Sequence, residues 1–197
     1  VDVAIEGQSL NNSDNGKILA GTELGLKVAQ IINQNKGLLF GKGATTVTGQ
    51  NLDNSGGSLV TQLGLDIRLD NALSNIEGLI SSEGTLTVNA ASLDSTRGSV
   101  SSAGALALTT TGVLNNQGGS ITTDSGLTLN SQSLNNSQNG LLSGKSATAV
   151  TTGTFDNTQG GQLISGDTLD LTATQVSNGV ASRIASDKAL TASVTGF

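Results

Sequence analysis

The sequence predicts an all-β protein folded as a right-handed parallel β-helix, a solenoid of about nine to ten coils with roughly 21 residues each. Three observations predict this fold. Apolar and polar positions recur together at that interval, apolar and polar residues alternate within short segments as in strands, and glycines separate those segments. The 197 residues form a single repeat array, which we treat as one domain over residues 1–197.

An apolar residue marks the start of each repeat and recurs every 20 to 22 residues; we call these positions the anchor column. Two residues later stands an amide side chain or, once, a serine, and we call these positions the amide column. The anchors are Leu10, Ile32, Leu52, Leu73, Leu93, Leu114, Leu134, Phe155 and Val176. The amide column is Asn12, Gln34, Asn54, Asn75, Ser95, Asn116, Asn136, Asn157 and Asn178.

A glycine follows five or six residues after each of the first eight anchors and forms the glycine column, from Gly16 to Gly161. Apolar residues recur two, eight and ten residues after it, as in Leu86-Thr87-Val88, with Thr in place of Leu in two repeats. This alternation indicates strands, and the glycines are expected to supply the bends between them. Parallel crossovers are nearly always right-handed, which predicts the sense of the coil. The columns run through both ends of the chain, so we predict a fragment of a longer filament.

The amide column lies on the same side as the anchors and therefore points inward, where unpaired amides would cost a few kcal/mol. Amides stacked coil on coil can bond to one another along the rod. We predict a structural ladder, with a row of ligand-binding amides as the alternative. Its predicted members are Asn12, Asn54, Asn75, Asn116, Asn136, Asn157 and Asn178.

Composition excludes several function classes. The chain has no His and no Cys, so zinc, haem and iron–sulfur centres and thiol chemistry are not expected, and we predict no cofactor. A net charge of −6 and 2% aromatic residues argue against nucleic-acid binding. No apolar run approaches the roughly 18 residues of a membrane span.

Carboxylates are the remaining candidates for chemistry. The densest charged patch consists of Glu77, Glu83, Asp94 and Arg97. We interpret it as a solvated surface, with a ligand contact and, least well supported, a catalytic site as the alternatives. Asp53, Asp94 and Asp156 follow their anchors and face outward, and Asp66 and Asp170 face outward on well-separated coils. We therefore predict no enzymatic activity.

Two further motifs have weaker chemical meaning. Gly144-Lys145-Ser146 is like the end of a phosphate-binding loop, but Asn139 stands where the first glycine of that loop is required. Phe40, Leu63 and Leu69 fall outside the core columns, and we expect them at corners of the coil, with a small exposed patch as the alternative.

The repeat resembles that of filamentous haemagglutinin. The segments that show this are Leu52-Asp53-Asn54-Ser55-Gly56-Gly57-Ser58-Leu59-Val60-Thr61 and Leu114-Asn115-Asn116-Gln117-Gly118-Gly119-Ser120-Ile121. The resemblance covers nearly the whole chain. It implies a large exoprotein exported by two-partner secretion through an outer-membrane β-barrel transporter, and located outside the cell or on the bacterial surface. Such proteins act as adhesins, haemolysins or effectors of contact-dependent growth inhibition.

The leading hypothesis is a structural filament segment that projects a receptor-binding or toxic domain. A second hypothesis is a module whose outward residues, such as Thr46, Thr87 and Thr128, bind a glycan or a target-cell receptor. A third, less favoured, is an extracellular polysaccharide lyase or hydrolase that depends on Glu77 or Glu83.

Overall fold

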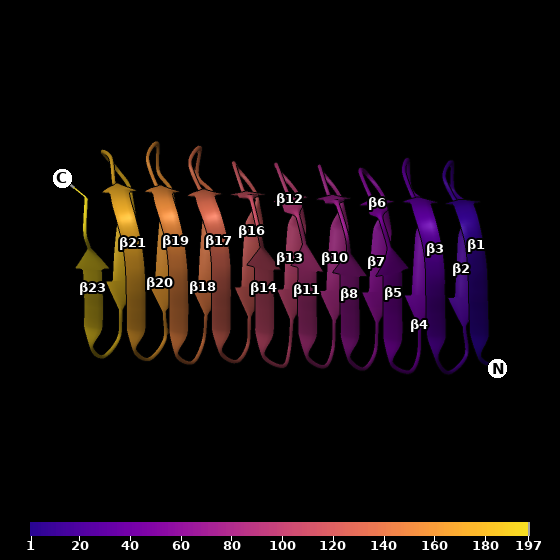
Figure 1. The fold of residues 1–197 in the computed structure, drawn as a ribbon. Coiled ribbons are helices and arrows are strands. Elements are labelled where there is room, and N and C mark those ends of the chain that lie inside the picture. Colours follow the sequence, from indigo (N-terminus) through magenta and orange to yellow (C-terminus); the bar gives the residue numbers. More distant parts are fainter. Residues whose placement is uncertain (197) are drawn as a thin grey trace.

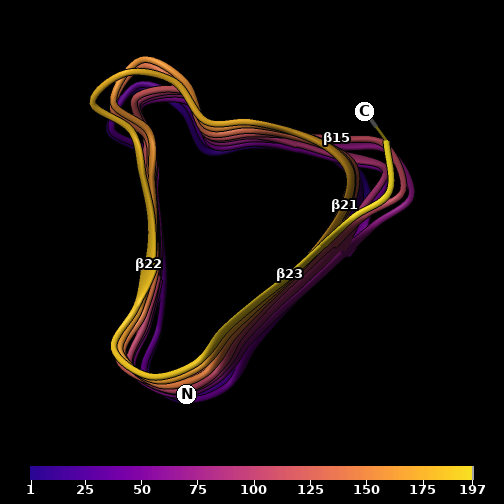
Figure 2. The same ribbon diagram turned by 90° about the vertical axis from the view of Figure 1, so that its left-hand side faces the viewer.

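The computed structural model describes residues 1–196, which form one parallel β-solenoid of stacked coils (Figure 1). Every paired strand runs parallel to its neighbours, and successive coils are about 21 residues apart, so the predicted fold class is confirmed. Figure 2 looks along the rod from the C-terminal end and shows a triangular cross-section. The chain turns anticlockwise in this view as it approaches the reader, which is the sense of a right-handed coil.

One wall of the triangle, which we call wall 3, is a nine-stranded sheet of four-residue strands. Within residues 1–196 these strands are β2 (Lys17–Ala20), β4 (Leu38–Gly41), β7 (Ser58–Thr61), β10 (Leu79–Ser82), β13 (Ser99–Ser102), β16 (Ser120–Thr123), β18 (Leu141–Gly144), β20 (Gln162–Ser165) and β22 (Arg183–Ser186).

The other two walls, walls 1 and 2, belong to one fourteen-stranded sheet that bends around a corner within residues 1–196. Five strands run continuously through both walls: β1 (Val3–Asn11), β3 (Leu24–Ile32), β17 (Leu127–Asn135), β19 (Thr148–Asp156) and β21 (Leu169–Ser177). In the remaining coils wall 1 contains β5 (Thr45–Gly49), β8 (Leu65–Leu69), β11 (Leu86–Ala90), β14 (Leu106–Thr110) and β23 (Leu190–Val194). Wall 2 contains β6 (Asn51–Asp53), β9 (Ala72–Ser74), β12 (Ser92–Asp94) and β15 (Val113–Asn115).

Matching apolar side chains stack on one another along the interior. Leu52 pairs with Leu73, and Leu73 pairs with Leu93, in the register of neighbouring coils. These residues are at most 1% exposed, and the other core columns join them in one continuous cluster. Because each layer is covered by the next, burial of the aliphatic side chains is shared between coils and stability belongs to the array.

The anchor of the second coil is Ile31, and our assignment of Ile32 was wrong by one residue. Leu10 pairs with Ile31, and Ile31 pairs with Leu52, so both intervals are 21 residues. Ile32 is in register with Asn11 and Asp53 and faces outward, half-buried. The sequence offers two adjacent isoleucines, and the parallel pairing of β3 with β1 and β6 decides which one enters the core.

The glycine column is explained by close backbone contact between coils, which differs from the conformational role that we expected. A Cβ at Gly140 would lie 2.5 Å from the backbone oxygen of Asn116 in the preceding coil. The positive φ of the bend falls instead on the residue before the glycine, for example Glu77 (φ 53°) and Gly118 (φ 62°). Glycine is therefore needed because no side chain fits between the coils at this corner.

The three apolar residues outside the core columns have different positions. Leu69 is 7% exposed and lies inside the corner between walls 1 and 2, as expected. Leu63 is 56% exposed, and Phe40 is a half-buried, outward-facing residue of β4. The prediction of side chains tucked in at a corner was therefore wrong for both: Leu63 lies in the bend between β7 and β8 but points into solvent, and Phe40 lies on the outer face of a strand.

Candidate functional site

The inward-pointing amides bond to one another from coil to coil. Asn12 Nδ2 donates to Asn33 Oδ1 at 2.8 Å, Asn33 to Asn54 at 2.7 Å, and Asn54 to Asn75 at 2.8 Å. The series resumes from Asn116 to Asn136 at 2.7 Å and continues to Asn157 and Asn178 at 2.8 Å each. All members except Asn12 and the terminal Asn178 are fully buried.

Each amide also binds the backbone of the bend. Asn54 Nδ2 contacts the carbonyl oxygen of Gly57 in its own coil at 3.4 Å and that of Leu79 in the next coil at 3.0 Å. Asn136 makes the same pair of bonds, to Gly140 and Gln162, at 3.0 and 2.9 Å. These amide groups are engaged within the rod and are shielded from solvent, so this arrangement offers them no route to a ligand.

The ladder contains Asn33, which the sequence assignment missed, and not Gln34. Gln34 lies one residue further on, and its Nε2 donates to Asp53 Oδ2 at 2.6 Å on the outside of the coil. The error follows from the misplaced anchor Ile32, since the amide column was counted from it. The uniform spacing of 21 residues between Asn12, Asn33 and Asn54 was the signal that could have identified Asn33.

Ser95 interrupts the ladder. It is fully buried, and Asn75 Nδ2 donates to its Oγ at 3.2 Å. Serine is too short to reach the next coil, and Asn116 Oδ1 is buried without a hydrogen-bond partner. The ladder is therefore two separate segments that meet at an unsatisfied acceptor.

The outward carboxylates that follow the anchors stabilise the bends. Asp53 Oδ1 accepts the backbone N–H of Ser55 at 3.0 Å, and Asp156 Oδ1 accepts that of Thr158 at 3.0 Å. Asp94 Oδ1 accepts the N–H and the hydroxyl of Thr96 at 3.0 and 2.6 Å. These are Asx-turn contacts, in which the carboxylate replaces a backbone acceptor at the turn.

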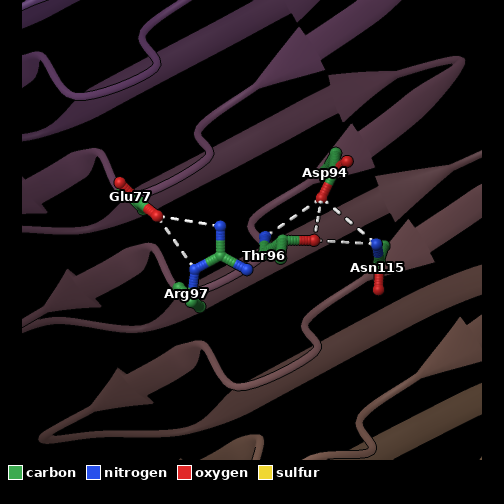
Figure 3. A network of polar contacts seen from close by, with 5 residues as sticks. All are labelled: Glu77, Asp94, Thr96, Arg97 and Asn115. Atoms are coloured by element: carbon green, nitrogen blue, oxygen red, sulfur yellow. Dashed lines mark hydrogen bonds and ion pairs between the residues drawn. The ribbon is translucent and has the colours of Figure 1, made fainter.

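The densest charged patch divides into separate groups in the structure (Figure 3). Arg97 pairs with Glu77 in the preceding coil, with Nη2–Oε1 at 2.8 Å. Asp94 belongs to a neighbouring network with Thr96 and Asn115, whose Nδ2 lies 3.2 Å from Asp94 Oδ1. Glu83 follows β10 whereas Glu77 precedes it, so the two glutamates lie at opposite ends of that strand.

The other charged candidates form exposed pairs. Lys145 of the Gly-Lys-Ser segment pairs with Asp124 at 2.7 Å, and Arg68 pairs with Asp66 at 2.6 Å. The hydroxyl of Thr22 donates to Asp2 and lowers the pKa of that exposed carboxyl below its usual value. Residues 1–196 contain no cluster of three potential metal-ligating His, Cys, Asp or Glu side chains and no helix able to cross a membrane.

Wall 1 carries the outward threonines and a shallow hollow. Thr46 and Thr87 lie in one file with Asp66 between them, since each is in register with it. At the corner of the first coils lies an open hollow of about 640 Å³. Its lining includes the small or apolar residues Gly7, Val28 and Gly49 and the charged residues Lys27, Arg68 and Asp70, which the sequence did not mark as a site.

A comparison with protein families gives a match to a repeat family. The family described as the haemagglutinin repeat matches residues 2–77, 64–159 and 132–196, which together span nearly the whole chain. Searches of curated proteins and of solved structures give no match.

Proposed function

Because the chain belongs to the haemagglutinin repeat family, a structural and adhesin-type repeat that is not typically enzymatic, we propose that it is a rigid filament segment. In this proposal the segment is part of a large secreted exoprotein and holds a receptor-binding or toxic domain away from the bacterial surface. Adhesion and contact-dependent growth inhibition are the two roles that such a spacer serves.

The observation that supports this role most directly is the unbroken register of the coils. Each coil is bonded to the next along all three walls, from β1–β3 at one end to β21–β23 at the other. At about 4.8 Å per coil, nine coils extend roughly 43 Å. A rod built in this way gains length in proportion to the number of coils, and the shared core resists bending between them.

The proposal includes export by two-partner secretion through an outer-membrane transporter. A chain without Cys forms no disulfide that would block passage of an unfolded polypeptide. Its strands pair only with strands of adjacent coils within residues 1–196, about 20 residues away in sequence. Each emerging coil can therefore fold onto the previous one outside the cell. Association with the outer membrane belongs to the same proposal.

Small-angle X-ray scattering on the intact chain and on a shortened variant tests the spacer role. Removal of residues 114–154 joins Val113 to Phe155 and deletes two coils in register. The longest dimension is then expected to fall by about 10 Å, with the cross-section unchanged. An unchanged length, or scattering typical of a flexible chain, contradicts a rigid spacer.

The hollow on wall 1 supports the second candidate, a glycan- or receptor-binding module. Lys27 and Arg68 line it together with small and apolar residues, a composition suited to a ligand that has both apolar and polar groups. Glycan-array and target-cell binding assays with the wild type and a Lys27→Ala/Arg68→Ala variant test it. Saturable binding that is lost in the variant favours this module, and binding that is absent from the wild type rejects it.

A further inference from the structure

Wall 3 differs from the other two walls in its outward-facing side chains. The seven strands from β4 to β20 present fourteen outward positions and none of them is charged, whereas the end strands β2 and β22 carry the outward residues Lys17 and Arg183. They are Leu38, Phe40, Ser58, Val60, Leu79, Ser81, Ser99, Ser101, Ser120, Thr122, Leu141, Ser143, Gln162 and Ile164. Wall 1 presents Lys27, Asp66, Arg68 and Asp170, and wall 2 presents Asp53, Asp94 and Asp156.

Apolar side chains gather on the first coils of this wall. Leu19, Phe40 and Val60 stand in one file across β2, β4 and β7, and Leu38 and Leu79 lie beside them. Leu19 is 56% exposed and Leu79 is 36% exposed. We call these five residues the apolar patch. A contiguous apolar patch on a flat sheet is a typical interaction surface.

From this wall we infer that two copies of the chain associate side by side, with wall 3 of one copy packed face to face on wall 3 of the other. The seven strands from β4 to β20 can pack on those of the other copy at about 10 Å without desolvating a charge, and Lys17 and Arg183 then lie at the two ends of the contact. The same contact through wall 1 or wall 2 would bury carboxylates, which is costly. Two of the serines tolerate burial because they already bond to each other across neighbouring coils, from Ser101 Oγ to Ser81 Oγ at 3.1 Å.

The area available agrees with a weak dimer. Seven coils at about 4.8 Å and four residues at about 3.3 Å give a wall of roughly 34 by 13 Å, or about 440 Å². Two copies together bury about 900 Å², close to the lower limit of about 1,000 Å² for a specific interface. We therefore expect a weak association that depends on concentration.

The two rods lie parallel in this dimer. A two-fold axis along the rods superimposes all seven coils of both walls and places the apolar patch on itself. In a fully overlapping antiparallel pair the patch would instead face the more polar coils around Ser143 and Gln162. The parallel arrangement therefore buries more apolar surface for the same area.

Sedimentation velocity over a concentration series tests association. The wild type is expected to pass from monomer to dimer as concentration rises, and a Phe40→Lys/Val60→Lys variant to bind at least about tenfold more weakly. The matched control is Asn89→Lys/Thr128→Lys, which adds the same charge to outward positions of wall 1. Melting curves show that each variant is folded. A wild type that stays monomeric, or a Phe40→Lys/Val60→Lys variant that dimerises normally, overturns the proposal.

Crosslinking tests the orientation, since the chain has no native Cys. Ser81→Cys and Ser143→Cys, each used alone with a short bis-maleimide, are expected to form covalent dimers in the parallel arrangement. A crosslink that forms only when the two variants are mixed overturns it. Binding of monomers to phosphatidylcholine vesicles, lost in Phe40→Lys/Val60→Lys, would assign the wall to a membrane surface and also overturn the dimer.

Discussion

Replacement of Ser95 by Asn is expected to repair the amide ladder and stabilise the protein. In the wild type Asn116 Oδ1 is buried without a hydrogen-bond donor, because Ser95 in the preceding coil is too short to reach this oxygen. An Asn at position 95 occupies the place that asparagine holds in the neighbouring coils. Its amide can donate to Asn116 Oδ1 and to the carbonyl oxygens of Gly98 and Ser120, by analogy with the bonds of Asn54.

The expected change in the free energy of unfolding follows from these contacts. A buried acceptor without a partner costs about 1–3 kcal/mol. Ordering the longer side chain costs about 0.5–1 kcal/mol. The expected gain in the free energy of unfolding is the difference, which centres near 1 kcal/mol and corresponds to a rise of about 2–4 °C in Tm for a chain of this size.

Thermal and urea unfolding followed by circular dichroism measure this gain, and Ser95→Asp is the matched control. Aspartate has nearly the shape of asparagine, but its carboxylate cannot donate a hydrogen bond and brings a negative charge beside Asn116 Oδ1. Ser95→Asp should therefore lower the Tm where Ser95→Asn raises it. A folded Ser95→Asn variant that melts at or below the wild-type temperature would refute the ladder as a source of stability.

Three further substitutions probe the same coils, each by urea unfolding. Asn116→Leu should lower the free energy of unfolding by about 2–4 kcal/mol, because it removes the donor to Asn136 and leaves buried acceptors unpaired. The control Asn130→Leu, on the outside of wall 1, should change this free energy little. Equal free energies of unfolding for the two variants would argue against the ladder. Gly140→Ala should lower the free energy of unfolding by more than about 2 kcal/mol, because its Cβ would lie 2.5 Å from the backbone oxygen of Asn116. The control Gly7→Ala should be neutral or mildly stabilising, because no atom lies within 4 Å of its added Cβ. Gly144→Ser alone should be destabilising, because its Cβ would lie 2.7 Å from Thr148 Oγ1. Adding Thr148→Leu should relieve this clash, because other coils have serine and leucine at these two positions, for example Ser82 and Leu86. Additive effects of the two substitutions on the free energy of unfolding would exclude this coupling.

The fold class could be predicted because residues of the same type recur at a nearly constant spacing along the chain. Alternation of apolar and polar residues identifies the strands, and an interval near 21 residues leaves room for three short strands and their bends. The anchors from Leu52 to Val176 follow from this pattern, and the structure stacks them in one file.

The second coil shows where pattern alone was insufficient. Ile31 and Ile32 are equally apolar, and Asn33 and Gln34 both carry amides, so residue type does not distinguish the two assignments. Pairing with the coils on either side distinguishes the two assignments, because a shift of one residue turns every side chain of a strand to the opposite face.

Local residue order and composition are enough to predict the strands, their inward and outward faces, the haemagglutinin-type repeat and the lack of His and Cys chemistry. Contacts between coils settle which isoleucine enters the core, why glycine stands beside Asn116, where Ser95 interrupts the ladder, and which wall has no charge on its seven central strands. These features arise from contacts between residues about 20 positions apart, and only the stacking of coils brings such residues within bonding distance.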